Sequence, residues 1–429
     1  MTGSSKSVLI LSHVFPPSGG AGVQRVLKFV KYLGDYGWRP VVVTPRSPSV
    51  PVRDHSYQDD LPPDLALYRL YTPEARAAGG GKGGGKGGDK GSARGGGGLR
   101  AGLRRLAGRL LFPDPHVVWL PFALPGTLAA ARRHRVRALL ASGPPFSIFL
   151  PAYLAARRLG LPLVLDFRDD WSGFFNKGFG AREAGWLWRN LVTRLEGRLV
   201  GGASLVIGNT PEMCRRLHRL HGGPEEKYVW IPNGFDPDDF RFPPPAPPDD
   251  GRLHILYVGT VFQSHPLDDL WQGIELLSPR ERRALAVTIV GRAEADQVLD
   301  PGLEGLEVKV IPYRPHQEVV RLLGRAHLLL LTLAAIPGLE RMVPAKLFEY
   351  LAARRPVLAL VPRGAASKIV EACQAGAVVP PGRPRDLARL LRQWMQKPPP
   401  PLGPPPRFFD RRVLTATLAR HLDRLSQGD

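Results

Sequence analysis

Residues 7–45 read SVLILSHVFPPSGGAGVQRVLKFVKYLGDYGWRPVVVTP, and this stretch decides the fold class. An apolar run at 7–12 predicts a buried strand, and the two prolines after it exclude a helix at that point. A helix-like pattern follows from Val23 to Tyr36, and a second apolar strand occupies 40–45. Apolar strands joined by amphipathic helices are typical of a parallel sheet that is covered on both faces.

The same alternation continues along the chain, in two series separated by a proline-rich stretch. The further strand-like runs stand at 137–143, 162–167, 203–210, 228–234, 253–259, 286–291, 307–313, 326–333 and 355–361. We therefore predict an α/β protein with two Rossmann-like β/α/β domains that face each other across a cleft. Open parallel sheets bind ligands beyond the carboxyl ends of their strands, so the active site is expected in that cleft.

Composition marks the domain boundaries. The predicted division is an N-terminal domain at 1–240, a proline-rich linker at 241–252, a C-terminal domain at 253–397, and a proline-rich spacer with a closing helix at 398–429. Within the first domain, 13 of the 20 residues at 79–98 are glycine. We expect a flexible loop there, because such a segment has little to bury and loses much entropy on ordering.

The charge of the chain requires an anionic partner. The 429 residues include 59 Lys and Arg but only 38 Asp and Glu, which gives a net charge of +21. Nucleic acid, phospholipid headgroups and nucleotide phosphates are the candidates. Two cysteines exclude a disulfide framework and a zinc cluster, which favours a reducing compartment. We find neither a signal peptide nor an apolar run of roughly 18–20 residues, so we expect a cytoplasmic protein.

The glycines at 19–22 form the first candidate site. Gly19, Gly20 and Gly22 lie between the first strand and its helix, where exposed amides and the helix dipole favour an anion. The alternative is an ordinary glycine turn. His13, directly after the strand, is a candidate for contact with the cleft or for a structural role.

The segment LDFRDDW at 165–171 is the second candidate. Four charged residues and a tryptophan crowd the carboxyl end of an apolar strand, namely Asp166, Arg168, Asp169, Asp170 and Trp171. We interpret them as a polar floor for a sugar or an acceptor. The alternative is a solvated loop with local ion pairs.

The third candidate is the helix that begins in VPAKLFEY at 343–350. Pro344 fits the first helical position, which places Lys346 in the first turn, where a cation opposes the helix dipole. A bound phosphate would remove this conflict. Glu349 lies on the same face and could accept hydrogen bonds from two vicinal ribose hydroxyls. The alternative is a Lys–Glu pair on the surface.

These motifs, in this order, resemble the glycosyltransferases of GT-B fold in the group 1 and family 4 branch. The resemblance rests on 13–44, 141–171, 231–240, 255–260 and 343–361. It implies a retaining, metal-independent transfer from a nucleotide-sugar donor to a glycan or lipid-linked acceptor, without a cofactor, in the synthesis of cell-surface polysaccharide or glycolipid. The nucleotide would bind mainly the C-terminal domain and the acceptor the N-terminal domain.

The resemblance also assigns residues. Glu349 matches the ribose-binding glutamate, and Gly19, Gly20 and Gly22 match the loop beside the donor phosphates. The chain departs from the family at the donor-sugar glutamate, where it has Arg341 with Glu340 beside it. An arginine and a lysine that usually follow the first C-terminal strand are not evident, and a frequent histidine is replaced near Arg168.

We therefore predict three groups of site residues. The predicted catalytic residues are Arg168, Asp169, Arg341 and Lys346, and the donor-binding residues also include Glu340 and Glu349. The predicted acceptor-side residues are His13, Asp166 and Trp171. No metal is predicted.

Residues 98–115 have leucines at helical spacing with arginines between them. A basic amphipathic helix is typical of binding to an anionic membrane surface, here the inner face of the plasma membrane. The alternative is a helix packed on the N-terminal domain with its arginines in water.

Three other functions stay open at this stage. A nucleotide-sugar epimerase would need further acid and base carboxylates, which we do not find. A nucleic-acid-binding protein would agree with the charge, but the basic residues are dispersed and no such motif is recognisable, so nucleic acid is not a predicted partner. Arg341 in place of a glutamate leaves room for an inactive scaffold protein.

Overall fold

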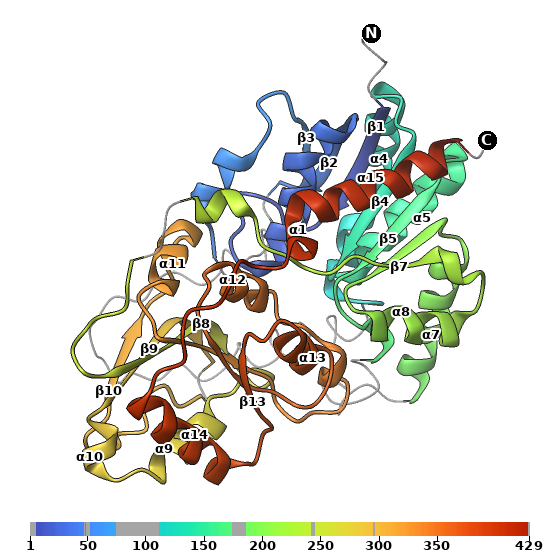
Figure 1. Cartoon of the computed structure of the whole chain (residues 1–429). Coiled ribbons are helices and arrows are strands. Elements are labelled where there is room, and N and C mark those ends of the chain that lie inside the picture. Colours follow the sequence, from blue (N-terminus) through green and yellow to red (C-terminus); the bar gives the residue numbers. More distant parts are fainter. Residues whose placement is uncertain are drawn as a thin grey trace, which may run out of the picture.

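The protein has two lobes, each built on a parallel sheet, in a computed structural model (Figure 1). The structure describes residues 6–46, 48, 52–73, 111–173, 186–241, 245–294 and 297–427. The predicted loop at 79–98 lies outside the described residues, as does nearly all of the predicted amphipathic helix at 98–115. No helix in the described ranges combines the length and the apolar character that crossing a bilayer requires.

The N-terminal sheet has seven parallel strands in the order β3-β2-β1-β4-β5-β6-β7. Their bounds in that order are Ala66–Leu70, Trp38–Pro45, Lys6–Ser12, Ala138–Gly143, Leu163–Phe167, Leu205–Gly208 and Tyr228–Trp230. The chain winds outward from β1 in both directions, so β1 and β4 are the central neighbours. A crevice for a ligand is expected at this point, where the strand order reverses.

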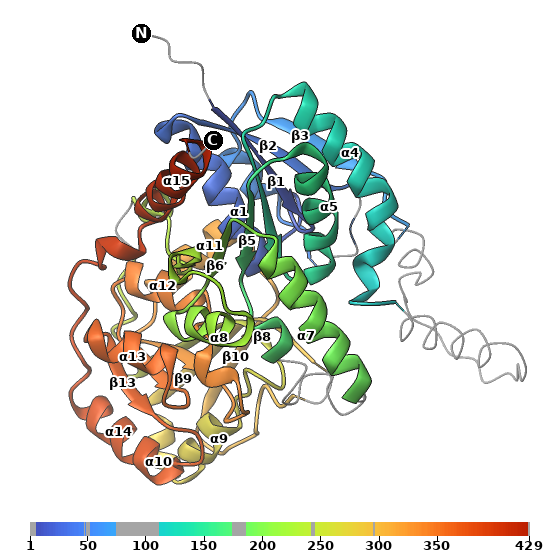
Figure 2. The same ribbon diagram turned by 90° about the vertical axis from the view of Figure 1, so that its right-hand side faces the viewer.

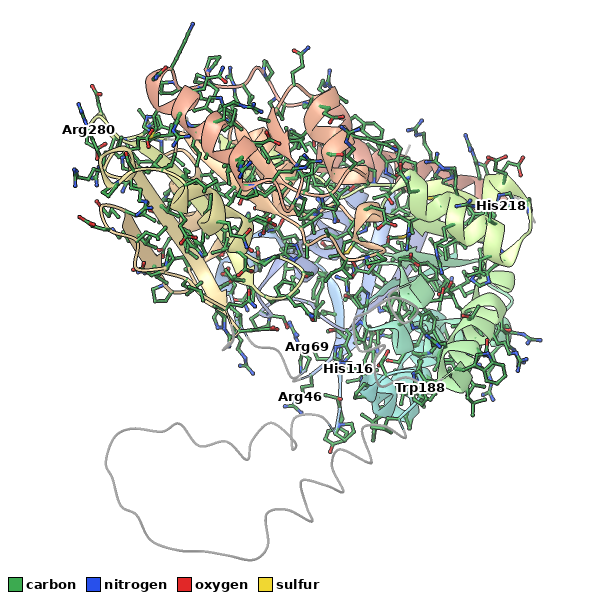
Figure 3. The ribbon with its side chains drawn as sticks, turned by 90° about the horizontal axis from the view of Figure 1, so that it is seen from below. Arg46, Arg69, His116, Trp188, His218 and Arg280 are labelled. Carbon is green, nitrogen blue, oxygen red and sulfur yellow. The ribbon has the colours of Figure 1, made fainter. Side chains whose placement is uncertain are left out.

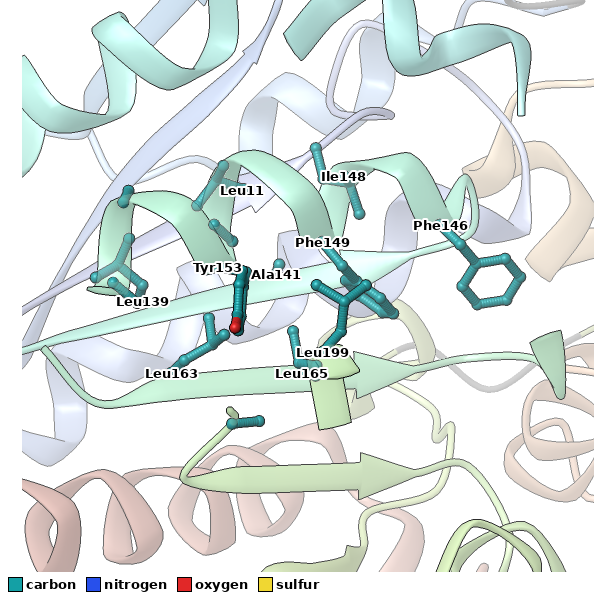
Figure 4. Packing of buried hydrophobic residues seen from close by; sticks show 14 of the residues in the cluster. Leu11, Leu139, Ala141, Phe146, Ile148, Phe149, Tyr153, Leu163, Leu165 and Leu199 are labelled. Carbon is teal, nitrogen blue, oxygen red and sulfur yellow. The ribbon is translucent and has the colours of Figure 1, made fainter. Parts of the chain in front are cut away.

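Helices cover both faces of this sheet. One face packs against α4 (Leu120–Arg133), α5 (Phe149–Leu159), α7 (Trp186–Gly201) and α8 (Pro211–His221). Figure 4 shows α5 on this face, with Phe149 and Tyr153 against Leu139, Leu163 and Leu165 from β4 and β5. The other face packs against α1 (Ala21–Tyr32) and α15 (Arg411–Gln427). Successive strand residues point to opposite faces, which is why the strands are apolar throughout.

The C-terminal sheet has six parallel strands in the order β10-β9-β8-β11-β12-β13. Their bounds in that order are Glu307–Ile311, Leu285–Ala293, Leu253–Val261, Leu328–Thr332, Val357–Leu360 and Gly376–Val379. One face carries α11 (His316–Leu323), α12 (Lys346–Ala352) and α13 (Ala365–Ala372). The other carries α9 (Asp268–Glu275) and α14 (Pro384–Gln396), and the short α10 covers Pro279–Arg282. The two-domain Rossmann-like fold expected from the sequence is confirmed.

The last helix of the chain lies on the N-terminal lobe. After α14, the chain returns to the N-terminal lobe, where α15 lies beside α1 (Figure 2). Its apolar side chains pack against those of β1 and β4. Leu414, Leu418 and Leu422 are at most 2% exposed there. Burial of these side chains holds α15 on the N-terminal lobe, since the helix would otherwise expose a continuous apolar stripe. The segment between α14 and α15 therefore links the two lobes.

Candidate functional site

A cavity of about 490 Å³ opens between the two lobes, beyond the carboxyl ends of both central strands. The N-terminal lobe contributes the glycine loop after β1 and the segment after β5, and the C-terminal lobe contributes the ends of β8, β9 and β10 and the start of α12. Polar and charged lining residues are Gln24, Arg25, Tyr57, Arg168, Asp169, Asn209, Asn233, Thr260, His265, Arg292, Tyr313, Arg314, His316, Lys346 and Glu349.

The glycine loop forms the N-terminal wall of the cavity. Gly19, Gly20 and Gly22 all line it, and α1 begins directly after Gly20, whose φ of +91° favours glycine. A Cβ on Gly22 would lie 3.2 Å from Arg168 Nη1. The loop therefore lets a helix N-terminus and an arginine approach the same space, which favours an anion there.

Arg168 and Arg25 both line the cavity, but of the two only Arg25 forms an ion pair among the described residues. Arg25 is 1% exposed and donates to Asp166 at 2.7–3.1 Å through Nε and Nη2. Arg168 is 9% exposed and donates to the backbone carbonyls of Gly22 and Pro144. Its Nε has no hydrogen-bond partner, and among the described residues no carboxylate forms an ion pair with it. A buried cation in this state favours an anionic ligand.

Lys346 supplies the corresponding cation from the C-terminal lobe. It is half-buried at the start of α12, and its Nζ lies 3.9 Å from the centre of the Tyr257 ring. Gly259 has a φ of +127°, and a Cβ there would come within 3.1 Å of Lys346 Nζ. Burial lowers the pKa of Lys346 to about 7, against the opposing effect of Glu349. An anion in the cavity would restore its charge.

The prediction of the α12 terminus needs one correction. The helix begins at Lys346 with Ala345 as its N-cap, so Pro344 precedes the helix and does not occupy its first position. Seven residues give only a short helix, and the dominant positive group at this end is therefore the Lys346 ammonium. Lys346 and Glu349 still share one face, and both line the cavity.

Glu349 is held by a contact from the other lobe. Gln24 Nε2 on α1 donates to Glu349 Oε1 at 2.9 Å and lies 3.2 Å from His316 Nδ1. His316 is 7% exposed, and its Nε2 lies 3.1 Å from Asp239 Oδ2. Burial lowers the pKa of His316, but the Asp239 and Glu349 carboxylates outweigh this effect, so the pKa is raised overall.

Asp169 is a lining carboxylate next to Arg168. Burial raises its pKa above the ordinary aspartate value, although the Arg168 charge opposes the shift. Of the described lining residues, Asp169 and Glu349 are the two that carry carboxylates. A carboxylate with a raised pKa is a better proton acceptor, which suits general base chemistry.

A carboxylate cluster with the spacing of metal ligands lies behind the cavity. Asp60, Asp236 and Asp239 each bring an oxygen within 4.8 Å of the others. Lys28 Nζ stands among them, at 2.6 Å from Asp60, 2.5 Å from Asp236 and 3.3 Å from Asp239. Lys31 pairs with Asp60 and Asp236 as well. Because two ammonium groups already compensate the cluster, its role is structural, at the junction of the lobes.

The three predicted acceptor-side residues lie beneath the cavity wall. Asp166 is fully buried and accepts from Arg25 and, at 2.6 Å, from Ser142 Oγ. Trp171 is 1% exposed and stacks on Phe146 with ring centroids 4.9 Å apart. His13 is 3% exposed and packs against His116 and Trp119. The interpretation of Asp166 and Trp171 as a polar floor is thus corrected, because Arg25 and the aromatic core bury them.

Arg341 joins the lobes and Glu340 pairs with it, and neither residue is among those that line the cavity. Arg341 donates to Asp170 Oδ2 through Nε and Nη2 at 3.0 and 2.8 Å, and to Glu340 Oε1 at 2.7 Å. Arg216 holds the other Asp170 oxygen at 2.8 Å. The arginine at the position of the family glutamate is therefore used in an ion pair between lobes.

Several lining residues were not predicted from the sequence. Asn209 follows the end of β6, and Tyr313, Arg314 and His316 follow the end of β10, up to the first residue of α11, so the rule that ligands bind at carboxyl ends of strands could have found them. Gln24 lies on α1, and nothing local distinguishes it from any polar residue on a helix.

Two family models match the sequence. The model described as Glycosyltransferase Family 4 matches residues 84–239, and the model described as Glycosyl transferases group 1 matches residues 252–397. Together they cover most of the chain. A comparison with curated proteins finds no match.

Solved structures with the same two-lobed architecture cover nearly the whole chain. Sucrose-phosphate synthase from Thermosynechococcus elongatus has a TM-score of 0.58 and 13% identity, over 98% of this chain and 96% of that one. Lipopolysaccharide outer core galactosyltransferase WaaB has a TM-score of 0.58 and 12% identity, over 98% and 99%. HepE of Anabaena, in complex with UDP-glucose, has a TM-score of 0.57 and 14% identity, over 98% and 97%. At these identities the likeness shows the fold.

Proposed function

Because the chain belongs to the group 1 glycosyltransferases of GT-B fold, we propose that it moves a sugar from a nucleotide-diphosphate donor to a glycan or lipid-linked acceptor. The transfer retains the anomeric configuration, uses no metal and no cofactor, and serves the synthesis of a cell-surface polysaccharide or glycolipid. Structures of similar fold are described in complex with UDP-glucose or as acting in lipopolysaccharide synthesis, which supports this class of donor and acceptor.

One observation carries the proposal. Arg168 and Lys346, one from each lobe, direct positive charge into the same cavity, and neither forms an ion pair within the described part of the chain. Breaking a bond between a sugar and a diphosphate transfers an electron pair to the diphosphate. Cations that are already in place stabilise this leaving group without reorganisation, and removing one such group typically costs about 100–1,000-fold in rate.

The donor is placed by the residues around these cations. Its diphosphate lies between Lys346, Arg168 and the start of α1, and its ribose hydroxyls donate to Glu349. The base then lies toward Tyr313 and Arg314, which line the same side of the cavity. Glu340 contacts the donor only if its ion pair with Arg341 opens, so its predicted role depends on lobe movement.

Asp169 is the remaining lining carboxylate for the chemical step. We assign Asp169 as the base that takes the proton of the acceptor hydroxyl. As it does so, the hydroxyl oxygen forms a bond to the anomeric carbon, and the bond from this carbon to the diphosphate breaks. Attack on the face that the diphosphate leaves gives retention. Closure of the lobes excludes water, which would otherwise hydrolyse the donor.

The acceptor approaches from the N-terminal lobe at an anionic membrane surface. Figure 3 shows Arg46, Arg69 and Trp188 along one margin of this lobe. Trp186 and Leu187 on α7 are 73% and 63% exposed. Exposed apolar side chains on a helix that also carries Arg189 and Arg194 favour peripheral binding to anionic lipid, with the protein on the cytoplasmic face.

The test of function is donor binding followed by product analysis. Purified protein is titrated with UDP-, GDP- and dTDP-sugars, and the donor that binds is offered to lipid-linked and free glycan acceptors with and without EDTA. We expect transfer that EDTA leaves unchanged, with a product of the donor's anomeric configuration by NMR. Folded protein that binds no member of the panel would contradict the proposal.

The same product analysis distinguishes a glycosyltransferase from a nucleotide-sugar epimerase. Incubation with the donor alone should leave the sugar configuration unchanged, whereas an epimerase would produce the 2-epimer without any acceptor. Co-sedimentation with vesicles that contain anionic or only neutral lipid tests the membrane surface independently.

A further inference from the structure

A chain of hydrogen bonds crosses from the N-terminal lobe to Glu349. Gln24 Nε2 on α1 donates to Glu349 Oε1 at 2.9 Å, although the two residues are 325 positions apart. The same nitrogen lies 3.2 Å from His316 Nδ1 and 3.3 Å from Tyr57 Oη. One side chain of the first lobe thus fixes a carboxylate of the second.

The hydrogen positions in this chain follow from the partners. The His316 Nε2 atom faces the Asp239 carboxylate, which can only accept, so Nε2 carries a hydrogen. Glu349 Oε1 can likewise only accept, so it takes a hydrogen from the Gln24 amide. A flipped amide would place the Gln24 oxygen against the Glu349 carboxylate, which is repulsive.

His316 is itself anchored to the N-terminal lobe. Its backbone N–H donates to Asp54 Oδ2 at 2.9 Å, and the Tyr313 hydroxyl donates to the same oxygen at 3.1 Å. Asp54 is 3% exposed. His316 and Asp54, which hold this side of the chain in register, are therefore both buried.

We propose that Gln24 and His316 are positioning residues that orient the Glu349 carboxylate for the ribose, which makes the N-terminal lobe part of the nucleotide site. The proposal rests on the assignment of Glu349 to the ribose under the proposed function. An ionised carboxylate offers about four acceptor positions. Gln24 occupies one of them on Oε1 and restricts rotation, so the remaining positions face the two vicinal hydroxyls.

The proposal predicts an effect that depends on the ligand's hydroxyl groups. Loss of Gln24 weakens binding only where the ligand has hydroxyls for Glu349 to accept. A purely structural role of Gln24 would weaken the binding of any nucleotide equally.

The experiment compares UDP with 2′,3′-dideoxy-UDP by calorimetric titration, or the guanosine pair if the donor panel selects guanine. We expect wild type to prefer the ribonucleotide by about tenfold or more, because hydrogen bonds to a charged group contribute about 1.5–3 kcal/mol. Gln24→Ala and His316→Ala should each reduce affinity for the ribonucleotide about three- to tenfold and leave that for the dideoxy analogue within about twofold.

The matched control is Gln317→Ala. Gln317 also bridges the lobes, since its Nε2 donates to Asp239 Oδ1 at 3.0 Å, but it does not contact Glu349. Both affinities should stay at the wild-type values in this variant. Thermal melting of each variant confirms folding, and His316→Ala decides the question if Gln24→Ala does not fold.

The outcomes separate the two proposals. If both variants keep the full preference for the ribonucleotide, Gln24 and His316 do not position Glu349, and the proposed function is unaffected. An equal loss for both ligands shows a structural role and overturns the inference as well. If the wild-type protein shows no preference for the ribonucleotide over its dideoxy analogue, Glu349 does not bind the ribose. If the wild-type protein binds no nucleotide, the proposed function itself is contradicted.

Discussion

Arg168 and Lys346 bring positive charge to one cavity by different physical means. Arg168 is fixed by two backbone carbonyls of its own lobe, and a guanidinium stays protonated at any physiological pH. Lys346 lies over the Tyr257 ring, and burial lowers its pKa to about 7. One lobe therefore provides a permanent charge and the other a charge that the ligand and the pH control.

The two cations differ in what fixes the position of one and the charge of the other. The position of Arg168 depends on the fold of the glycine loop, because Gly22 accepts one of its hydrogen bonds. The charge of Lys346 depends on its surroundings, since a bound anion raises the pKa of a buried ammonium. Arg341, the third predicted cation, differs from both because Asp170 and Glu340 already compensate its charge.

The largest effect is expected at Arg168. Arg168→Ala should reduce kcat by about 100–1,000-fold, as is typical when a preorganised stabilising group is removed. Arg168→Lys should recover little, because an ammonium cannot replace the planar fork between two carbonyls. Steady-state transfer kinetics measure both variants, with Lys368→Ala, an exposed surface cation, as control. Activity within about fivefold of wild type in Arg168→Ala would contradict the assignment.

Lys346→Met should reduce kcat by about 100-fold, at the lower end of the same range, because it removes one of the two cations that stabilise the leaving diphosphate. The substitution keeps the length of the side chain and its packing on Tyr257. Single-turnover measurements with saturating donor isolate the chemical step. An unchanged rate of that step would place Lys346 outside the reaction.

Asp169→Asn tests the base at the same cavity wall. The change preserves shape and removes the proton acceptor, so kcat should fall by about 100-fold while nucleotide affinity stays similar. Rates are followed from pH 6 to 9 alongside wild type. A parallel loss of nucleotide affinity would instead indicate that Asp169 organises the donor site.

The pH dependence of nucleotide binding distinguishes the two cations. Lys346 is charged below its pKa of about 7 and neutral above it, and the diphosphate favours the charged form. Affinity for UDP should therefore fall by about tenfold between pH 7 and 9. Lys346→Met should lose this dependence, whereas a variant at Arg168 should retain it. Affinity that is independent of pH in wild type would refute a titrating lysine in the site.

The smallest effect is expected at Arg341. Arg341→Ala leaves Asp170 paired with Arg216, so the free energy of unfolding should fall by only about 1 kcal/mol and kcat should stay within about fivefold. Urea denaturation and kinetics check these values. A loss of activity as large as that of Arg168→Ala would show that Arg341 takes part in catalysis, as predicted from the sequence.

The pattern of apolar residues predicted the central strands of both sheets but not all of their edge strands. Strand β3 is half-exposed at every position, and β13 has a single fully buried residue. Both form edges of their sheets, where one side of the strand has no neighbour to bury it. Without a continuous apolar run, the sequence lacks the signal from which the other strands were predicted.

Residue roles could be predicted only where the chemistry is local. Lys346 and Glu349 are three positions apart, so helical geometry alone places them on one face. Asp166 and Arg25 are 141 positions apart, and Arg341 and Asp170 are 171 apart. Their sequence gives no indication that these charges compensate each other, and so Asp166 and Arg341 were predicted to meet ligands.

The two parallel α/β lobes, the glycine loop and the helix that presents Lys346 and Glu349 could be predicted from the residue pattern, because strand burial and helical spacing depend on near neighbours in the chain. The pattern could not predict which cations lack an ion pair or which residue of one lobe holds Glu349 in the other. Those outcomes depend on distances between segments that are hundreds of residues apart, and these distances are set by the packing of the complete fold.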